Sequence, residues 1–356
     1  MTPDASQIPG LLRECFGAGV SVGEIAALAG DASTRRYVRA HLSGAGAPAT
    51  AVVMVLADSG QSISSEELAV FKTPPRELPF VNVYRFVRAL GVSVPEVYLD
   101  ASTRGFVVLE DIGDTTLWDA AQDLDRNGLV TLYRRSIEQL LTLVLDGTRR
   151  RDDECIAFQQ AFDERLFAWE FEHFIEYGLE KRLNEPMPAA EMAELRRHFA
   201  AIAKRLGAAP RFLAHRDFHS WNLFVQDGRI RVIDFQDALL APATYDLATL
   251  LGDRDTPLRI DPTVESDLLD YYHQQWQARG GPAWSAEAMR AEYFDCALQK
   301  AFKVVGRFHY LDMVKGKPGY LRYLPSTWRQ IDRLLERDPS LANVRAILAR
   351  HADELR

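Results

Sequence analysis

The chain has 356 residues, 47% of them hydrophobic and 26% charged, which is typical of a globular protein with two domains or lobes. Its formal net charge of -8 repels phosphate backbones and argues against nucleic acid as a partner. Three distant cysteines without C-x-x-C spacing argue against disulfides and a zinc site, and the sequence contains no export signal or long apolar run, so we expect a cytoplasmic protein without a membrane partner.

The first 110 residues mix short strands with helices and are predicted to form a small, strand-rich N-lobe that covers the nucleotide. A Ser cap with early Glu residues predicts a helix within 62–71, and apolar residues at helical spacing predict another over 80–90. Alternating or continuous apolar runs bounded by Gly and Pro predict four strands, at 37–42, 50–57, 95–100 and 105–110.

From residue 111 to residue 356, long amphipathic segments predict a larger, helical C-lobe that holds the acceptor site. Expected helices cover roughly 127–148, 161–178, 189–206, 263–278, 286–311 and 326–350. A strand pair interrupts them at 222–235, where an Asp-Gly dipeptide between two apolar runs predicts a hairpin. The predicted fold class is therefore α+β and bilobal, with a hinge at about 109–114.

Polar residues gather at both ends of the predicted hairpin. The string HRDFHSWN leads into it and IDF ends it. Phosphoryl transfer from ATP needs a carboxylate beside the acceptor hydroxyl, plus an amide oxygen and a second carboxylate to hold Mg²⁺ against the phosphates. Because a hairpin returns the chain to its start, we expect Asp217 to be catalytic and Asn222 and Asp234 to be metal ligands. The alternative is a loop whose Asp and Asn residues only cap turns.

Residues 212–251, FLAHRDFHSWNLFVQDGRIRVIDFQDALLAPATYDLATLL, resemble the aminoglycoside phosphotransferase-like kinases, and the resemblance runs across the whole chain. Two further segments carry a more specific resemblance: GDASTRRYVRA (30–40) and LQKAFKVVGRFHYLDMVKGKPGYLRYLP (298–325). They resemble the anomeric sugar kinases that phosphorylate N-acetylmuramate and N-acetylglucosamine at the 1-hydroxyl in cell-wall recycling. The resemblance implies a bilobal protein-kinase-like fold, with ATP and Mg²⁺ as cofactors and a small sugar as the acceptor.

The N-lobe departs from the protein-kinase pattern in two ways. No Gly-x-Gly-x-x-Gly precedes the first strand, and the strand at 51–55 carries no lysine for the phosphates. Hydroxyl, backbone N–H and arginine groups can replace these features, although the arginines could instead form salt bridges on a solvated strand. Residues of the loop and of the connector are expected to bind the nucleotide: Ser33, Thr34, Arg35, Arg36, Glu110 and Ile112.

A C-terminal helix offers three cations at spacings of three and four residues, near one helical face: Lys300, Lys303 and Arg307. Such a face suits an anionic acceptor, for example the lactyl carboxylate of N-acetylmuramate. The alternative is a solvated basic stripe that pairs with neighbouring acids. Gln236 and Asp237 follow the second metal ligand closely, so we expect them to contact the sugar or to brace the loop.

Residues around the catalytic loop are expected to support its structure: His215, Arg216, His219 and Asp246. A neutral imidazole at His219 can bond a backbone carbonyl, which favours a structural role over proton transfer. Asp246 is interpreted as a helix cap, or as a partner of His215 or Arg216, rather than as a sugar ligand.

The first hypothesis is therefore ATP- and Mg²⁺-dependent phosphorylation of the anomeric 1-hydroxyl of N-acetylmuramate or N-acetylglucosamine. A second keeps the fold and changes the acceptor to an aminoglycoside, choline or another amino alcohol, which would need carboxylates that face ammonium groups. A third is a nucleotide-binding pseudokinase, suggested by the missing strand lysine and opposed by the retention of the base and both metal ligands.

Overall fold

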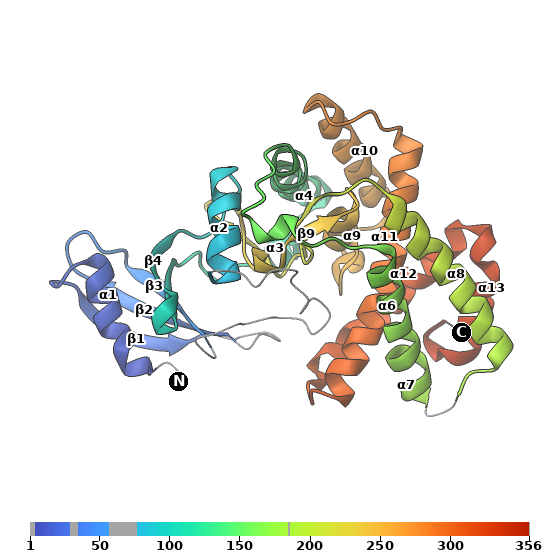
Figure 1. Ribbon diagram of the computed structural model, residues 1–356, viewed down its shortest axis with the longest axis horizontal. Coiled ribbons are helices and arrows are strands. Elements are labelled where there is room, and N and C mark those ends of the chain that lie inside the picture. Colours follow the sequence, from blue (N-terminus) through green and yellow to red (C-terminus); the bar gives the residue numbers. More distant parts are fainter. Residues whose placement is uncertain (1–3, 29–34, 57–76, 184–185, 356) are drawn as a thin grey trace.

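The computed structural model describes residues 4–28, 35–56, 77–183 and 186–355. A five-stranded antiparallel sheet lies at one end of the molecule, and a larger, mostly helical part makes up the rest (Figure 1). This arrangement confirms the α+β, bilobal kinase-like fold class. The boundary at 109–114 stays a prediction, and the helix expected within 62–71 lies outside the described residues.

The sheet has the strand order β1-β2-β3-β5-β4. Its strands are β1 (Ser21–Ala27), β2 (Arg36–Ser43), β3 (Thr50–Val55), β4 (Val97–Ala101) and β5 (Phe106–Glu110). The four predicted strands are confirmed as β2 to β5. β1 was not predicted, because this edge strand is mostly exposed and shows no alternation of apolar residues.

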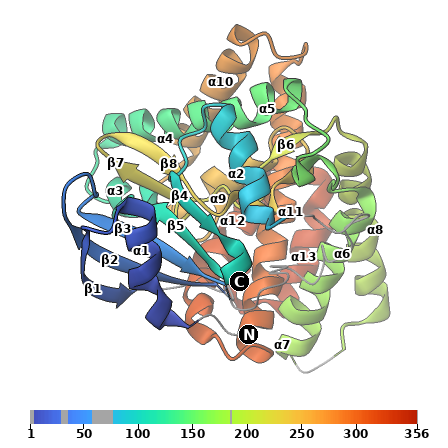
Figure 2. The ribbon, with the colours of Figure 1, turned by 60° about the vertical axis from the view of Figure 1, so that its left-hand side comes forward.

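Alternate side chains of β3 face two different cores. Val53 and Val55 pack beneath α1 (Ile8–Phe16), which lies against the sheet in Figure 2. Val52 and Met54 belong to the main core, to which α2 (Pro79–Ala89) also contributes. Since successive residues of a strand point to opposite faces, β3 is covered on both sides. This double burial explains its continuous apolar sequence.

The helical part contains a set of helices of very different lengths. They are α3 (Leu117–Ala121), α4 (Arg126–Leu141), α5 (Gly147–Arg149), α6 (Glu164–His173), α7 (Lys181–Leu183), α8 (Ala189–Ala208), α9 (Tyr245–Gly252), α10 (Pro262–Ala278), α11 (Ala286–Met313), α12 (Leu324–Arg337) and α13 (Ala342–His351). Two π-helical turns extend α4 and α6, at Thr142–Asp146 and Phe174–Glu180. None of the helices in the described part of the chain has the length and hydropathy required to cross a bilayer.

The prediction of one helix over 326–350 is wrong. The chain leaves α12 at Asp338, whose backbone is extended (φ -116°, ψ 102°), and enters a short 3₁₀ turn at Pro339 before α13 begins. Proline has no N–H for the helical ladder and disfavours the α conformation of the residue before it. The Asp-Pro dipeptide therefore splits the segment into two helices.

Two strand pairs lie within the helical part. β6 (Phe212–Ala214) pairs with β9 (Leu239–Ala241), and β7 (Leu223–Gln226) forms a hairpin with β8 (Arg229–Val232). Asp227 (φ 49°) and Gly228 (φ 72°) both take positive φ in the turn, as two-residue hairpin turns that match the strand twist require. The hairpin predicted from the Asp-Gly dipeptide is confirmed.

Candidate active site

The site lies where the loop after β6 meets the end of β8. The N–H of Ile233 donates to the carbonyl of Asn222 (3.0 Å), and Nε2 of His215 lies 2.8 Å from the carbonyl oxygen of Ile233. The first bond continues the β7–β8 ladder by one step, and the second ties the loop to it. The ends of the hairpin are therefore held together, and with them the loop that carries Asp217.

Asp217 is fixed by a lysine from α11. Its Oδ1 lies 3.2 Å from Nζ of Lys300, which also donates to the carbonyl of Arg216 (3.3 Å). Burial raises the pKa of the Asp217 carboxyl, but the positive charges of Lys300 and Arg216 outweigh it and hold this pKa well below its ordinary value. The Asp217 side chain is still 38% exposed. It is thus an oriented carboxylate that a substrate hydroxyl can reach.

Asn222 and Asp234 occupy the two strand ends beside this carboxylate. Nδ2 of Asn222 donates to the carbonyl of Asp217 (3.0 Å), so its Oδ1 is the atom with which the amide could bind a metal. Asp234 adopts φ 65°, and its Oδ1 accepts a bond from Gln236 Nε2 (2.8 Å) and lies 3.6 Å from Arg35 Nη2. Gln236 Nε2 also donates to Asp237 Oδ2 (3.1 Å), so Gln236 and Asp237 brace the loop.

This donor set fits Mg²⁺. The pKa of the Asp234 carboxyl is raised by burial and further by the neighbouring carboxylates of Asp237 and Asp217, against the lowering effect of Arg35. A bound cation relieves such crowding of negative charge. No group of three or more His, Cys, Asp or Glu side chains within the described ranges could hold a metal ion. One amide and one carboxylate suffice for Mg²⁺, which takes its remaining ligands from phosphates and water.

Asp246 braces the catalytic loop from the first turn of α9. Its Oδ2 accepts the backbone N–H of His215 (2.5 Å) and its Oδ1 that of Arg216 (2.9 Å). Burial raises the pKa of this carboxyl to about 6, although His215 acts to lower it. Arg216 takes φ 82°, a strained conformation for a residue other than glycine, and the two bonds hold it there. Asp246 is therefore a hydrogen-bond partner of His215 and Arg216 through their backbone.

His219 is buried, and its burial, together with the nearby charge of Arg254, holds the pKa of its imidazole well below the ordinary value. The ring is therefore neutral. The backbone of the same residue donates its N–H to the Asp217 carbonyl and accepts from the Asn222 N–H, each at 2.9 Å. Both contacts are made by the backbone, so a structural role for the His219 imidazole stays a prediction.

The residues expected to bind the nucleotide are found in different settings. Arg35 is buried and reaches Asp234, whereas Arg36 is exposed on β2; Ser33 and Thr34 lie outside the described residues. The Glu110 side chain pairs with Arg231 of β8, with Oε2 of Glu110 2.5 Å from Nη2 of Arg231. The backbone N–H of Glu110 donates to the carbonyl of Glu96. Ile112 is buried. The contact of this connector with adenine stays a prediction.

The cations of α11 have acidic or aromatic partners. Lys300 pairs with Asp217 as described, Nζ of Lys303 lies 2.6 Å from Oε1 of Glu170, and Arg307 stacks over the ring of Tyr310 at 5.2 Å. Gln299 donates to the other carboxylate oxygen of Glu170 (2.6 Å), which is 2% exposed. Lys300 and Lys303 thus pair with neighbouring acids, as the alternative expected, but Lys300 is buried and does not lie on a solvated stripe. The contact of both lysines with the acceptor stays a prediction.

Two groups beside the site were not predicted from the sequence. Glu170 could not be told apart from Glu172 and Glu176, which lie close to it in the aromatic-rich segment 162–179. The other group consists of aromatic side chains around Arg254, among them Trp221 within the catalytic loop itself. One sequence signal could have revealed this aromatic group: Trp221 lies between the proposed base, Asp217, and the first metal ligand, Asn222.

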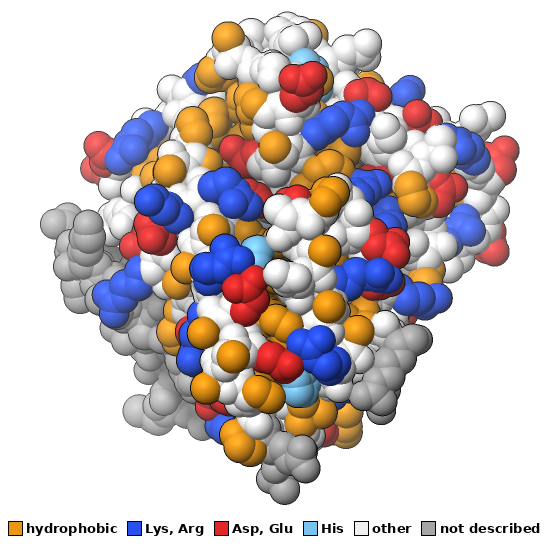
Figure 3. Space-filling model, turned by 90° about the vertical axis from the view of Figure 1, so that its right-hand side faces the viewer, with side chains coloured by type: hydrophobic (Ala, Val, Ile, Leu, Met, Phe, Trp, Pro, Cys, Tyr) orange, Lys and Arg blue, Asp and Glu red, His pale blue; other side chains and the backbone are white. Residues whose placement is uncertain are grey.

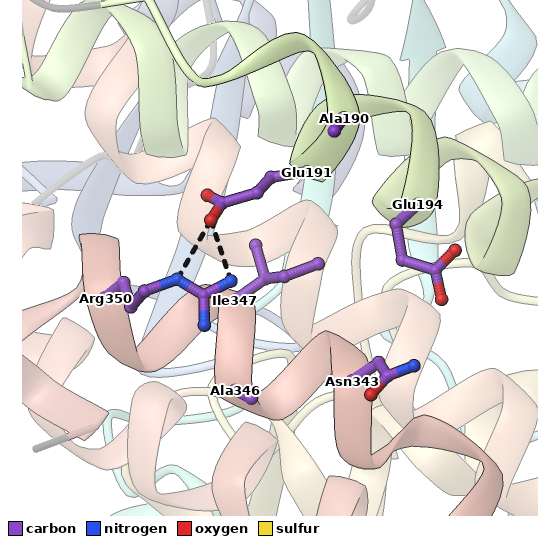
Figure 4. A pocket seen from close by; sticks show the side chains of 7 residues that line it. All are labelled: Ala190, Glu191, Glu194, Asn343, Ala346, Ile347 and Arg350. Atoms are coloured by element: carbon purple, nitrogen blue, oxygen red, sulfur yellow. Dashed lines mark hydrogen bonds and ion pairs between the residues drawn. The ribbon is translucent and has the colours of Figure 1, made fainter.

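The helices far from the sheet carry a separate surface pocket, between α8 and α13 (Figure 4). Glu191 and Arg350 pair across it at 2.8 Å. Its lining residues are Ala190, Glu191, Glu194, Asn343, Ala346, Ile347 and Arg350. None of them belongs to the hairpin or to its loops. On the face at the right of Figure 1, basic and acidic side chains are interspersed, without a large patch of one sign (Figure 3).

Comparisons with known proteins agree with this geometry. The model of the phosphotransferase enzyme family matches residues 24–287. A Pseudomonas putida protein named N-acetylmuramate/N-acetylglucosamine kinase is 29% identical over 346 residues, which cover 96% of this chain and 93% of the relative.

Two solved structures share the fold at low sequence identity. The choline kinase of Cryptosporidium parvum Iowa II has a TM-score of 0.61 at 11% identity and covers 99% of this chain and 100% of its own. An ADP-bound aminoglycoside phosphotransferase has a TM-score of 0.55 at 15% identity, and the match covers 95% of this chain and 99% of the aminoglycoside phosphotransferase. At these identities, both show similarity of fold alone.

Proposed function

Because the chain belongs to the phosphotransferase enzyme family, we propose that it transfers the γ-phosphoryl group of ATP to the anomeric 1-hydroxyl of N-acetylmuramate or N-acetylglucosamine. The observation that carries the proposal is the meeting of Asp217, Asn222 and Asp234 at the ends of one hairpin, with Asp217 held ionised beside Lys300. The name of the Pseudomonas putida relative supports the choice of acceptor. Such a reaction would serve cell-wall recycling in the cytoplasm, where unpaired thiols such as Cys15, Cys155 and Cys296 persist.

The electrostatics of Asp217 suit an acidic hydroxyl. A carboxylate whose pKa lies well below its ordinary value is a weak base, so Asp217 orients the hydroxyl and takes its proton late, in a loose transition state. An anomeric hydroxyl is more acidic than an ordinary alcohol and therefore needs less help from a base. Lys300, 3.2 Å from Asp217, adds positive charge at the point where the phosphoryl group meets the acceptor oxygen.

The other side of the site would hold the nucleotide. Oδ1 of Asn222 and the carboxylate of Asp234 would bind Mg²⁺, which when bound neutralises charge on the phosphates. Arg35 comes from the sheet side and lies 3.6 Å from Asp234, so it is placed to supply the cation that the doubly buried β3 lacks. This contact supports the interpretation that the missing strand lysine is a variation of the site and not a loss of activity.

A cationic acceptor fits the described residues less well. Asp246 is 1% exposed and its two oxygens accept backbone N–H groups, so it cannot form an acidic wall for an ammonium group. Two lysines, Lys300 and Lys303, stand near the Asp217 carboxylate instead. This balance of charge favours a sugar over an aminoglycoside or choline.

An acceptor panel tests the proposal. Purified protein is incubated with ATP and Mg²⁺ and with N-acetylmuramate, N-acetylglucosamine, their 1-O-methyl glycosides, kanamycin or choline, and release of ADP is followed. We expect turnover of one or both free sugars with loss of their reducing ends, and no turnover of the methyl glycosides. Turnover of kanamycin or choline alone would refute the sugar proposal, and phosphorylation of a methyl glycoside would refute the anomeric position. The Asp217→Ala variant controls for contaminating ATPase.

A further inference from the structure

The connector that joins the sheet to the helical part, residues 110–116, lies along the hairpin that carries the metal ligands. The N–H of Val225 in β7 donates to the carbonyl of Thr115 (2.9 Å). The next residue of the connector, Thr116, forms an isolated antiparallel bridge with Phe224. The far end of the connector is therefore paired with the hairpin through the backbone.

A partly buried ion pair holds the near end of the connector. Arg231 of β8 donates from Nη1 to Oε1 of Glu110 (3.0 Å) and from Nη2 to Oε2 of Glu110 (2.5 Å). Nη1 also donates to Oε1 of Gln226 (2.6 Å), and Nη2 to the carbonyl of Val94 (2.9 Å). The Arg231 and Glu110 side chains are 12% and 21% exposed, so salt screens them less than a surface pair. Arg231 thus joins both strands of the hairpin to the first residue of the connector.

The orientation of Glu110 is fixed from two sides. The N–H of Glu96 donates to its Oε2 (3.0 Å), and the N–H of Glu110 donates to the carbonyl of Glu96 (2.8 Å). Burial raises the pKa of the Glu110 carboxyl, but the hydrogen bonds from Arg231 and Glu96 outweigh this effect and keep the pKa below its ordinary value. A guanidinium that meets a carboxylate through two nitrogens fixes both distance and direction.

A second arginine holds the connector to the sheet. Arg39 of β2 binds Asp111 through Nε (2.7 Å) and Nη2 (2.9 Å), and it binds Asp114 through Nη1 and Nη2 (2.8 Å each). The N–H of Gly113, whose φ is 81°, donates to Oδ1 of Asp111 (3.1 Å). Of the two arginines, Arg231 is therefore the one that joins the connector to the strands of the metal ligands.

The hairpin separates the two ends of the nucleotide site. In the proposed function, the base of ATP lies at the connector and its phosphates lie at Asn222 and Asp234. Arg231 stands three residues before Asp234, and its partner Gln226 stands four residues after Asn222, which is about 13 Å of extended strand. A ligand that occupies two joined sites binds tightly only where their separation matches its own span. The bond between connector and hairpin sets this separation.

We propose that Arg231 is a positioning residue, which joins Glu110 to the hairpin and so sets the distance between the base and the phosphates of the bound nucleotide. This inference rests on the proposed function, which makes ATP the phosphoryl donor. It confines the effect of Arg231 to ligands that occupy both ends of the site. Adenosine and Mg²⁺-pyrophosphate each occupy one end only, so their binding does not depend on the residue.

The test measures dissociation constants of Mg²⁺-ADP, adenosine and Mg²⁺-pyrophosphate by calorimetry in the wild type and in Arg231→Met. We expect Mg²⁺-ADP to bind about ten-fold more weakly in the variant, and the two half-ligands to change by less than about two-fold, because only the link between the two ends is loosened. Arg229→Met is the matched control, since Arg229 is an exposed arginine two residues earlier on β8. It should leave all three constants unchanged.

Retained binding of the half-ligands shows that the variant is folded. If adenosine weakens as much as Mg²⁺-ADP, Arg231 only supports the connector, and if pyrophosphate does, it only supports the metal ligands. Either result would overturn the inference, as would unchanged binding of Mg²⁺-ADP.

If Arg231→Met does not fold, Glu110→Gln removes the ion pair and keeps the shape of the side chain. A smaller loss confined to Mg²⁺-ADP is then expected, and equal changes for the three ligands would overturn the inference. A wild type that binds Mg²⁺-ADP no more tightly than either half-ligand has no link to lose and would overturn it as well. A wild type that binds none of the three would instead refute the proposed function.

Discussion

The loop at the β7–β8 hairpin and the charged face of α11 meet at Asp217, but their residues acquire their partners in different ways. In the hairpin region, Asp246 binds the backbone of His215 across 31 residues of sequence, and Asn222 binds the Asp217 carbonyl across five. On α11, Lys300 reaches Asp217 across 83 residues and Gln299 reaches Glu170 across 129. The shorter spacings of the first region therefore show in sequence motifs, whereas the partners on α11 become clear only once the fold has brought them together.

The largest effect is expected at the base of the hairpin region. Asp217→Asn should lower kcat by about 10³-fold, because an amide can neither orient the hydroxyl in the same way nor accept its proton. Steady-state kinetics with the best sugar of the panel measure the loss. Asp227→Asn makes the same chemical change in the hairpin turn, where asparagine tolerates a positive φ, and should keep wild-type activity. Equal activity of the two variants would remove Asp217 from the mechanism.

The contribution of α11 is tested at Lys300. Lys300→Met should lower kcat/KM by roughly 10- to 100-fold, through lost stabilisation of charge at the transferred phosphoryl group. Its positive charge lowers the pKa of Asp217, so its removal raises that pKa and moves the acidic limb of the pH profile to higher pH. A purely structural lysine would reduce the rate without a shift of the limb. Lys300→Arg should restore part of the wild-type profile.

The brace at Asp246 predicts a pH dependence of its own. The pKa of about 6 means that this carboxyl is ionised at neutral pH and gains a proton as the pH falls through 6. The protonated form binds the N–H groups of His215 and Arg216 less strongly, so activity should decrease below about pH 6 while Asp217 stays ionised. In Asp246→Asn we expect about ten-fold lower activity at pH 8 and no limb near pH 6. A limb that survives this substitution belongs to another group.

The smallest effect on turnover is expected at Lys303, where the effect on stability is large. Lys303→Met leaves Glu170, which is 2% exposed, without its cationic partner, so the free energy of unfolding should decrease by about 3 kcal/mol. Denaturant unfolding measures the change, and the double variant Lys303→Met/Glu170→Leu should recover part of it. A stable Lys303→Met with strongly reduced turnover would show that the whole face of α11 acts in catalysis.

Prediction from sequence succeeded where the deciding contacts are local. The Asp-Gly turn, the strands β2 to β5 and the ends of the hairpin follow from patterns a few residues long. The missed strand β1 is an exposed edge, which has no apolar alternation to reveal it. The partners of Lys303 and the aromatic side chains around Arg254 depend on segments far apart in the chain. The single helix predicted over 326–350 was wrong because the amphipathic pattern continues past Pro339, a residue that breaks helices.

The short hairpin also sets a rule for how the chain can change in length. Asn222 and Asp234 flank a ladder that runs from Leu223 opposite Val232 to Gln226 opposite Arg229. One residue inserted in β7 or β8 would turn the following side chains to the other face and remove one ligand from its partner. An insertion between Asp227 and Gly228 would leave the ladder intact. Homologous chains should therefore differ in length at the turn and keep both strands at a fixed number of residues.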